Sequence, residues 1–260
     1  MDPKEQYIAV FDSGVGGISV LRELMTQLPG EHFLYFGDSA NAPYGVRSRQ
    51  EVCDLTLSAA EYLMTQGIKA LVVACNTATS AAIETLRSSY LDTVIIGIEP
   101  ALKVAADRFP GGNIGILATP MTLREEKFGA LLEKCGKSCS CTCIPAPGLA
   151  ELVEQGKEDS EEAEALLRPL LEPLRGKLDA LVLGCTHYPF AAGVIRRILG
   201  DKVALPDGSE GTARETRRRL EEAGLLRTGE EGSLRMENSA ADPAILRRCF
   251  ALLQKEGLEE

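Results

Sequence analysis

Short apolar runs alternate with amphipathic segments from one end of this 260-residue chain to the other. Strands that are buried on both faces read as unbroken apolar runs, whereas covering helices are apolar on one side only. The alternation therefore predicts an α/β fold, in which helices cover both faces of a mostly parallel sheet. Seven apolar runs are predicted to be strands, at residues 7–11, 32–36, 70–74, 94–98, 113–118, 140–145 and 180–184.

The predicted helices lie between these strands, and local signals mark some of their ends. Ser48 followed by Glu51 is a capping box that begins one helix, and Gly67 ends it. Asp242 and Pro243 predict the start of the last helix, with a good N-cap residue followed by proline in the first turn. Other late segments are predicted as a helix over 211–223, a glycine- and glutamate-rich loop over 228–232 and a frayed end over 257–260.

The cycle of strand and helix starts again beyond Val94, which suggests two α/β units. We expect two pseudo-symmetric domains, each a mostly parallel sheet flanked by helices, with the active site in the cleft between them. The segment after Asp207 is predicted to pack back on the first unit. The first domain would then comprise residues 1–98 plus 208–260, and the second residues 99–207.

The strands at 70–74 and 180–184 belong to a near-repeat, because ALVVAC and ALVLGC each end in a cysteine. Polar residues follow both Cys75 and Cys185, and α/β proteins keep their active sites where buried strands give way to such residues. Two equivalent thiols suit a reaction that needs one chemical group from two opposite directions. Stereoinversion at a single carbon is the simplest reaction of that kind, so the repeat predicts a racemase.

Racemisation by two thiols needs no cofactor, because one thiolate removes the proton and a thiol on the opposite face returns another. A free cysteine has a pKa of about 8.5, so each thiol needs help to ionise at neutral pH. Helix starts predicted directly after Cys75 and Cys185 would favour the thiolates. Asp12, at the end of the first strand, and His187 are candidates to move the protons.

Composition and charge exclude several classes of function. Apolar residues make up 45% and charged residues 25%, as in ordinary globular proteins. The net charge of −10 repels phosphate backbones and anionic lipid surfaces, so we expect no nucleic-acid or membrane partner. The chain lacks an export signal and any run of eighteen apolar residues, which predicts a cytoplasmic protein. Its eight cysteines are therefore expected as free thiols.

The glycine-rich segment at residues 12–17, DSGVGG, follows the first strand and opens a helix. It resembles a phosphate-binding turn but matches neither G-x-G-x-x-G nor a Walker loop with its lysine. Backbone donors, Ser13 and Asp12 suit a carboxylate or an ammonium group equally well. Alternatively, the glycines only permit close packing of the helix on the strand.

Two other interpretations of the cysteines stay open. A cysteine hydrolase would use Cys185 as nucleophile and His187 as base, but it leaves Cys75 unexplained. A thiolate metal-binding or redox protein would use a second cluster, whose spacing lacks the paired C-x-x-C of common zinc modules. That cluster consists of Cys135, Cys139, Cys141 and Cys143.

Several motifs together resemble the glutamate racemases, in an order and spacing that match across most of the chain. They are DSGVGG at 12–17, GD at 37–38 with PYG at 43–45, ACNTA at 74–78 and LGCTHYP at 183–189. The resemblance implies cofactor-independent interconversion of L- and D-glutamate, which supplies D-glutamate for bacterial peptidoglycan. It also implies two α/β domains with the site between them, and a homodimer.

The resemblance assigns roles to individual residues. Cys75 and Cys185 would be the acid/base thiols, supported by Asp12 and His187 respectively, with Glu154 as a further catalytic position. No metal is implied. The runner-up is an aspartate or hydantoin racemase of the same superfamily, and His187 favours glutamate because the aspartate enzymes tend to carry a glutamate there. The implied substrate-binding residues are Asp12, Ser13, Pro43, Tyr44, Gly45, Asn76, Thr77, Thr119, Thr122, Thr186 and His187.

Overall fold

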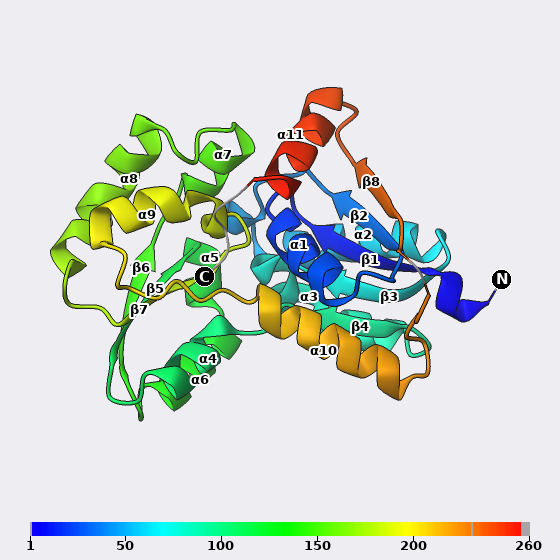
Figure 1. The fold of residues 1–260 in the computed structure, drawn as a ribbon, viewed down its shortest axis with the longest axis horizontal. Helices are drawn as coiled ribbons and strands as arrows, with labels where there is room; N and C mark the ends of the chain where they lie inside the picture. The colour runs from blue at the N-terminus through cyan, green and yellow to red at the C-terminus, as the bar shows by residue number, and fades with distance from the viewer. Residues whose placement is uncertain (1, 230, 256–260) are drawn as a thin grey trace.

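The computed structural model describes residues 2–229 and 231–255, which form two parallel sheets flanked by helices (Figure 1). The larger sheet has five strands in the order β4-β3-β1-β2-β8, and the smaller has three in the order β6-β5-β7. Every named pair of neighbouring strands is parallel. The strands are β1 (Tyr7–Asp12), β2 (Phe33–Gly37), β3 (Ile68–Val73), β4 (Val94–Gly97), β5 (Asn113–Ala118), β6 (Ser140–Pro145), β7 (Ala180–Leu183) and β8 (Leu234–Asn238).

Helices cover both faces of each sheet, so each half of the molecule has two apolar cores. The larger sheet carries α1 (Ile18–Gln27), α2 (Arg49–Met64), α3 (Asn76–Ser89), α10 (Ser209–Glu222) and α11 (Pro243–Leu253). The smaller carries α4 (Ala101–Arg108), α5 (Pro120–Arg124), α6 (Glu126–Cys135), α7 (Leu149–Glu154), α8 (Glu161–Leu171) and α9 (Ala192–Leu199). Short 3₁₀ turns are η1 (Pro3–Glu5), η2 (Tyr44–Val46), η3 (Glu172–Leu174) and η4 (Tyr188–Ala191).

The predicted α/β fold with parallel sheets is confirmed, and so are the seven predicted strands. The capping box is present, because the Ser48 side chain accepts from the Glu51 N–H while the Glu51 carboxylate accepts from the Ser48 N–H. Asp242 caps α11 through the N–H of Ala244, as its position before Pro243 predicted.

Strand β8 was not predicted. It follows the predicted loop and pairs in parallel with β2, so the chain after α10 returns to the edge of the larger sheet. Its sequence, LRMEN, has only two apolar residues, and all five positions are exposed or half-buried, as suits an edge strand. The predicted fraying at 257–260 lies outside the described residues.

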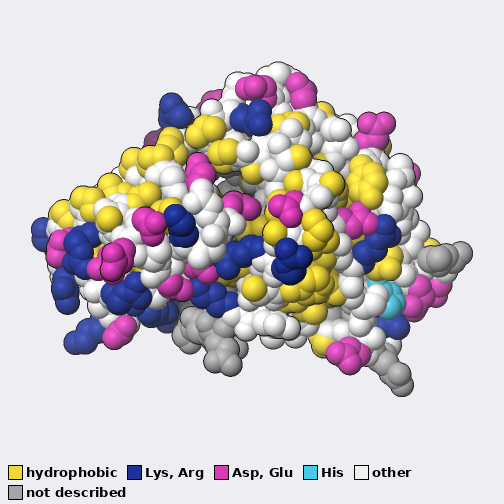
Figure 2. All heavy atoms as spheres, turned by 90° about the horizontal axis from the view of Figure 1, so that it is seen from above, with side chains coloured by type: hydrophobic (Ala, Val, Ile, Leu, Met, Phe, Trp, Pro, Cys, Tyr) yellow, Lys and Arg dark blue, Asp and Glu magenta, His cyan; other side chains and the backbone are white. Residues whose placement is uncertain are grey.

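The surface bears on possible partners. Figure 2 shows basic and acidic side chains interspersed on the face seen from above, without one unbroken basic patch. Among residues 2–229 and 231–255, no helix has both the length and the apolar character needed to cross a bilayer.

Candidate active site

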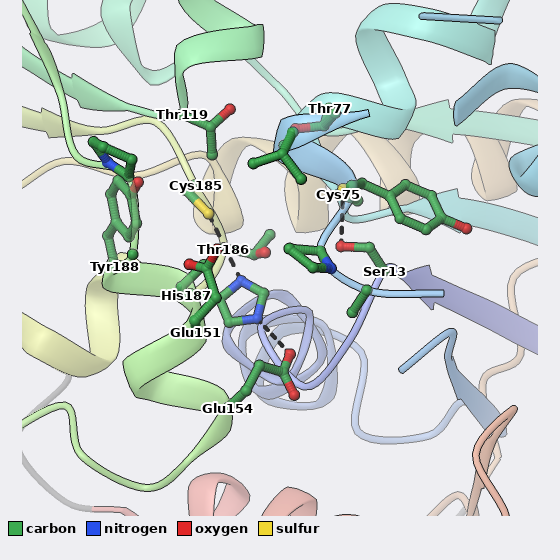
Figure 3. A pocket seen from close by; sticks show the side chains of 18 of the residues that line it. Ser13, Cys75, Thr77, Thr119, Glu151, Glu154, Cys185, Thr186, His187 and Tyr188 are labelled. Atoms are coloured by element: carbon green, nitrogen blue, oxygen red, sulfur yellow. Dashed lines mark hydrogen bonds and ion pairs between the residues drawn. The ribbon is translucent and has the colours of Figure 1, made fainter. Parts of the chain in front are cut away.

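The carboxyl ends of the two sheets face a common cavity of about 340 Å³, and both thiols of the near-repeat line it. Cys75 lies two residues beyond the end of β3, and Cys185 lies two residues beyond the end of β7. Figure 3 shows the two sulfur atoms on opposite sides of the pocket. The geometry that stereoinversion requires is therefore present: two like groups, from different sheets, reach one space.

Cys75 is the N-cap of α3, and its side chain is almost fully buried. Its sulfur accepts from the N–H of Ala78 at 3.4 Å, and its thiol donates to the hydroxyl of Ser13 at 3.5 Å. Burial, followed by the charge of Asp12, raises the pKa of Cys75 to about 12 despite these two hydrogen bonds. The N–H of Ala78 at the helix start favours the thiolate, as expected, but the cost of burying the charge exceeds this contribution.

Cys185 has a different set of neighbours. Its sulfur lies 3.7 Å from Nδ1 of His187, and Nε2 of the same ring lies 2.7 Å from Oε1 of Glu154 (Figure 3). Burial opposes a charge on His187, but the hydrogen bonds to Cys185 and Glu154 outweigh it and raise the pKa of His187 well above its usual value. Burial likewise opposes the charge of Glu154, yet the bond to His187 lowers its pKa. Glu154, His187 and Cys185 thus form a continuous relay for a proton.

No α-helix begins directly after Cys185, contrary to the prediction. The chain enters the 3₁₀ turn η4 at Tyr188, and α9 begins only at Ala192. The neighbour of the Cys185 sulfur is therefore the His187 ring rather than a helix N-terminus.

Asp12 joins the two halves of the molecule. Its fully buried carboxylate accepts from the N–H of Gly14 at 3.0 Å and from the hydroxyl of Thr186 at 3.1 Å. Burial raises the pKa of Asp12, although the charge of His187 offsets part of the rise. Asp12 influences Cys75 through its charge, since its side-chain hydrogen bonds within the described residues go to Gly14 and Thr186.

The glycine-rich turn at 12–17 packs against the relay from the other half. The N–H of Val15 donates to Glu154 Oε1 at 2.8 Å. A Cβ at Gly14 would lie 1.9 Å from that same oxygen, and one at Gly16 would lie 2.3 Å from Nδ1 of His187. Glycine is needed at both positions because side chains of the opposite half, Glu154 and His187, occupy the space. Gly14 and Gly16 therefore permit close packing of the two halves, the alternative stated above for these glycines.

Comparison with known proteins identifies the family. The profile of the Asp/Glu/Hydantoin racemase family matches residues 11–228. The chain belongs to this racemase family. It is 47% identical over 256 residues to a glutamate racemase of Clostridium botulinum, covering 98% of this chain and 99% of that protein.

Solved structures of racemases have the same fold. Glutamate racemase from Francisella tularensis in complex with D-glutamate is 29% identical with a TM-score of 0.86, covering 97% of this chain and 95% of that one. Glutamate racemase from Thermus thermophilus in complex with β-chloro-D-alanine is 38% identical with a TM-score of 0.81, covering 98% and 95%.

Most of the residues predicted for this racemase site line the cavity. Besides the two thiols they are Ser13, Pro43, Tyr44, Gly45, Asn76, Thr77, Thr119, Glu154, Thr186 and His187. Asp12 and Thr122 do not line it. Thr122 lies behind Thr119, and the two hydroxyl oxygens are 3.0 Å apart. Tyr44 lines the cavity, and its hydroxyl donates a hydrogen bond to Asp38 at 2.6 Å.

Sequence reasoning missed other residues that line the racemase pocket. Tyr188 belongs to a motif that signals the site, whereas Ile245 comes from the distant helix α11 and had no signal. The missed residues are Ser39, Ala42, Val46, Pro120, Ala146, Pro147, Gly148, Ala150, Glu151, Gln155, Tyr188 and Ile245.

The second cysteine cluster lies outside the racemase pocket. Cys139 and Cys141 have their sulfur atoms 3.5 Å apart, Cys135 is buried and Cys143 is exposed. All eight cysteines are reduced. In the described part of the chain, no three or more His, Cys, Asp or Glu side chains are grouped to hold a metal ion. The thiolate-metal alternative is not favoured, because the chain matches the racemase family and its glutamate racemases over nearly its whole length.

Proposed function

We propose that this racemase interconverts L- and D-glutamate without a cofactor and supplies D-glutamate for peptidoglycan. One observation carries the proposal: Cys75 and Cys185 come from different sheets and line opposite sides of one cavity. One thiolate removes the α-proton of glutamate, and the thiol on the opposite face protonates the carbanion. The two thiols exchange roles in the reverse direction.

The neighbours of each thiol fit these roles. His187 accepts the proton of Cys185, and Glu154 stabilises the resulting imidazolium. The raised pKa of Cys75 keeps it a neutral thiol, which suits the acid when Cys185 acts as base. The resemblance pairs Asp12 with Cys75, and the charge of Asp12 raises the pKa of Cys75, so Asp12 helps to keep Cys75 protonated as the acid.

The polar lining is proposed to hold the substrate's charged groups. Ser13, Thr119 and Thr186 offer hydroxyls, and Asn76 and Thr77 begin α3, whose N-terminus attracts anions. Pro43, Tyr44 and Gly45 form the wall of the cavity beside η2. Thr122 supports Thr119 from behind.

We keep the domain boundaries as part of this proposal. All five strands of the larger sheet lie within residues 1–98 plus 208–260, and the three strands of the smaller lie within 99–207. The resemblance also leads us to propose a cytoplasmic homodimer, which light scattering on the purified protein would test. We expect the enzyme to keep full activity after dialysis against a metal chelator, with nothing added back, because the proposed reaction needs no cofactor.

The test is incubation of the purified protein with L-glutamate in deuterated water, following circular dichroism and α-deuterium together. We expect the optical signal to decay to zero as deuterium enters the product. L-Aspartate in parallel tests the runner-up substrate, since one methylene changes selectivity by only about 1–3 kcal/mol. Racemisation of aspartate but not glutamate would reassign the substrate and leave the chemistry intact.

The thiol assignment is tested by Cys75→Ser and Cys185→Ser. Each variant should lose racemisation, because a serine hydroxyl is far less acidic than a thiol. Exchange of the α-proton of a single enantiomer is compatible with this assignment. Full interconversion by either single variant contradicts it.

A further inference from the structure

Helix α11 connects the two halves of the molecule. Cys249 and Leu252 on this helix are buried in the core of the larger sheet. Arg248, directly before Cys249 in sequence, contacts the segment around α7 of the other half. Figure 1 shows α11 and α7 beside each other at the top of the molecule. The late segment of the chain thus reaches the helix that carries Glu154.

The contacts of Arg248 are specific. Its Nε and Nη2 donate to the carbonyl oxygen of Val153 at 3.2 and 2.9 Å, and Nη2 also donates to the nearly buried carboxylate of Glu158. The planar guanidinium fork suits such paired acceptors. Lys255 adds a second link between the same segments, with ion pairs to Glu158 at 2.9 Å and Asp159 at 2.6 Å.

Val153 immediately precedes Glu154, which ends α7. Because α7 has only six residues, a shift of its last turn would move the Glu154 carboxylate away from both His187 and the Val15 N–H. The positive charge of Arg248 also helps to keep Glu154 ionised. The loss of the His187 contact and the effect of the Arg248 charge on Glu154 both reach Cys185 through His187. The hydrogen bonds of Cys75 go to Ser13 and Ala78 instead.

We propose that Arg248 is a positioning residue for one thiol only: it holds the end of α7 so that Glu154 orients His187 for proton transfer at Cys185. This inference rests on the proposed two-thiol racemisation. It gives α11, a helix that lies outside both cysteine motifs, a role in proton transfer at Cys185.

Isotope effects can separate the two thiols where ordinary rates cannot. L- and D-glutamate have equal free energies, so kcat/KM must fall equally in both directions in any variant. When the substrate carries deuterium at the α-carbon in ordinary water, only the thiol that removes it handles the heavy isotope. Slowing the step at Cys185 therefore raises the isotope effect for the enantiomer that Cys185 deprotonates. For the enantiomer that Cys75 deprotonates, the isotope effect falls toward a value of 1.

The test compares Arg248→Met with His187→Asn, the exposed neighbour variant Arg247→Met and wild type. Arg248→Met should lower kcat/KM by about tenfold to a hundredfold, as expected for small misplacement of a catalytic group. Its two isotope effects should diverge in the same sense as those of His187→Asn. Arg247→Met should match wild type in both measurements. Arg248→Lys, which keeps the charge and loses the fork, should fall between.

The other outcomes overturn the proposal. A fall in kcat/KM with both isotope effects unchanged would show that Arg248 only supports folding, and unchanged kinetics would show no role. Should Arg248→Met fail to fold, Arg248→Lys is judged by the same divergence. Absence of glutamate racemisation in wild type is a separate result, which overturns the proposed function before any variant is compared.

Discussion

At the scale of single residues, the site depends on how closely the glycine-rich turn approaches the relay. Gly14 and Gly16 leave room for Glu154 and His187, which come from the other half of the molecule. The cavity has a thiol on each of two opposite sides, but the surroundings of the two thiols differ. Cys75 is a buried thiol with a raised pKa of about 12, whereas Cys185 contacts a histidine bonded to a carboxylate.

We expect Gly16→Ala to lower kcat/KM by about tenfold to a hundredfold, because the added methyl group displaces the His187 ring. Glutamate racemisation is the measurement. Gly129→Ala is the matched control, since a Cβ there meets nothing within 4 Å, and alanine in that helix should stabilise by roughly 0.5–1 kcal/mol. Normal racemisation by Gly16→Ala would mean that the turn at residues 12–17 accommodates the methyl group without disturbing the contacts of His187.

The residues that sequence alone could find are those with a local pattern. The near-repeat exposed Cys75 and Cys185, and the position two residues on suggested His187. Glu154 was found only through the family resemblance, because a glutamate on an amphipathic helix has no signal of its own. The reason for glycine at Gly16 depends on a partner 171 positions away in sequence, which spacing cannot show.

At the scale of elements, a buried ion pair ties the larger sheet to the N-terminal segment and to the segment that follows α10. Nζ of Lys69, on β3, lies 2.5 Å from Oε2 of Glu31, and both side chains are at most 1% exposed. The Lys69 ammonium also donates to the carbonyl oxygens of Lys4 at 2.6 Å and Leu225 at 3.1 Å. Glu31 in turn accepts from the backbone N–H of Arg227 at 2.8 Å.

Lys69→Met should lower the free energy of unfolding by about 3–5 kcal/mol, because it leaves the Glu31 carboxylate buried without its counter-ion. Urea denaturation measures the change. Lys127→Met removes an exposed partner of Glu84 and should cost no more than about 1 kcal/mol. Equal losses in the two variants would contradict the importance given to burial.

Elements with unbroken apolar runs were predictable, and those whose stability comes from their neighbours were not. The seven predicted strands were present because β-sheet burial on both faces leaves a clear sequence pattern. Strand β8 was missed because an edge strand needs few apolar residues when β2 already supplies its hydrogen-bond partners. The helix expected after Cys185 is replaced by η4, which begins with Tyr188 and Pro189.

At the scale of the whole molecule, polar contacts between the two halves hold them in register. Asp12 bonds to the Thr186 hydroxyl, the Ser19 hydroxyl donates to the Thr186 carbonyl oxygen at 3.0 Å, and Val15 bonds to Glu154. Sequence placed the strand ends on a common edge within each half. It could not show which residues of opposite halves meet, since that depends on how the two units pack.

Thr186→Val tests the contact between the halves. It removes the hydroxyl that donates to Asp12, so the free energy of unfolding should fall by about 1–3 kcal/mol, the usual cost of an unsatisfied buried group. Thr186→Ser keeps the hydroxyl and should lose less. Urea denaturation of both variants beside wild type measures the difference.

The difference between these variants should also depend on pH, with a sign set by Asp12. Burial raises the pKa of this carboxyl in the folded protein, so its ionised form opposes folding increasingly as pH rises above the unfolded value of 3.8. Loss of the Thr186 donor raises that pKa further. The free energy of unfolding of Thr186→Val should therefore drop further below that of Thr186→Ser as pH rises through the pKa that Asp12 has in the folded protein. If the difference in free energy of unfolding between the two variants stays constant or narrows over this range, the Thr186 hydroxyl does not stabilise the ionised form of Asp12.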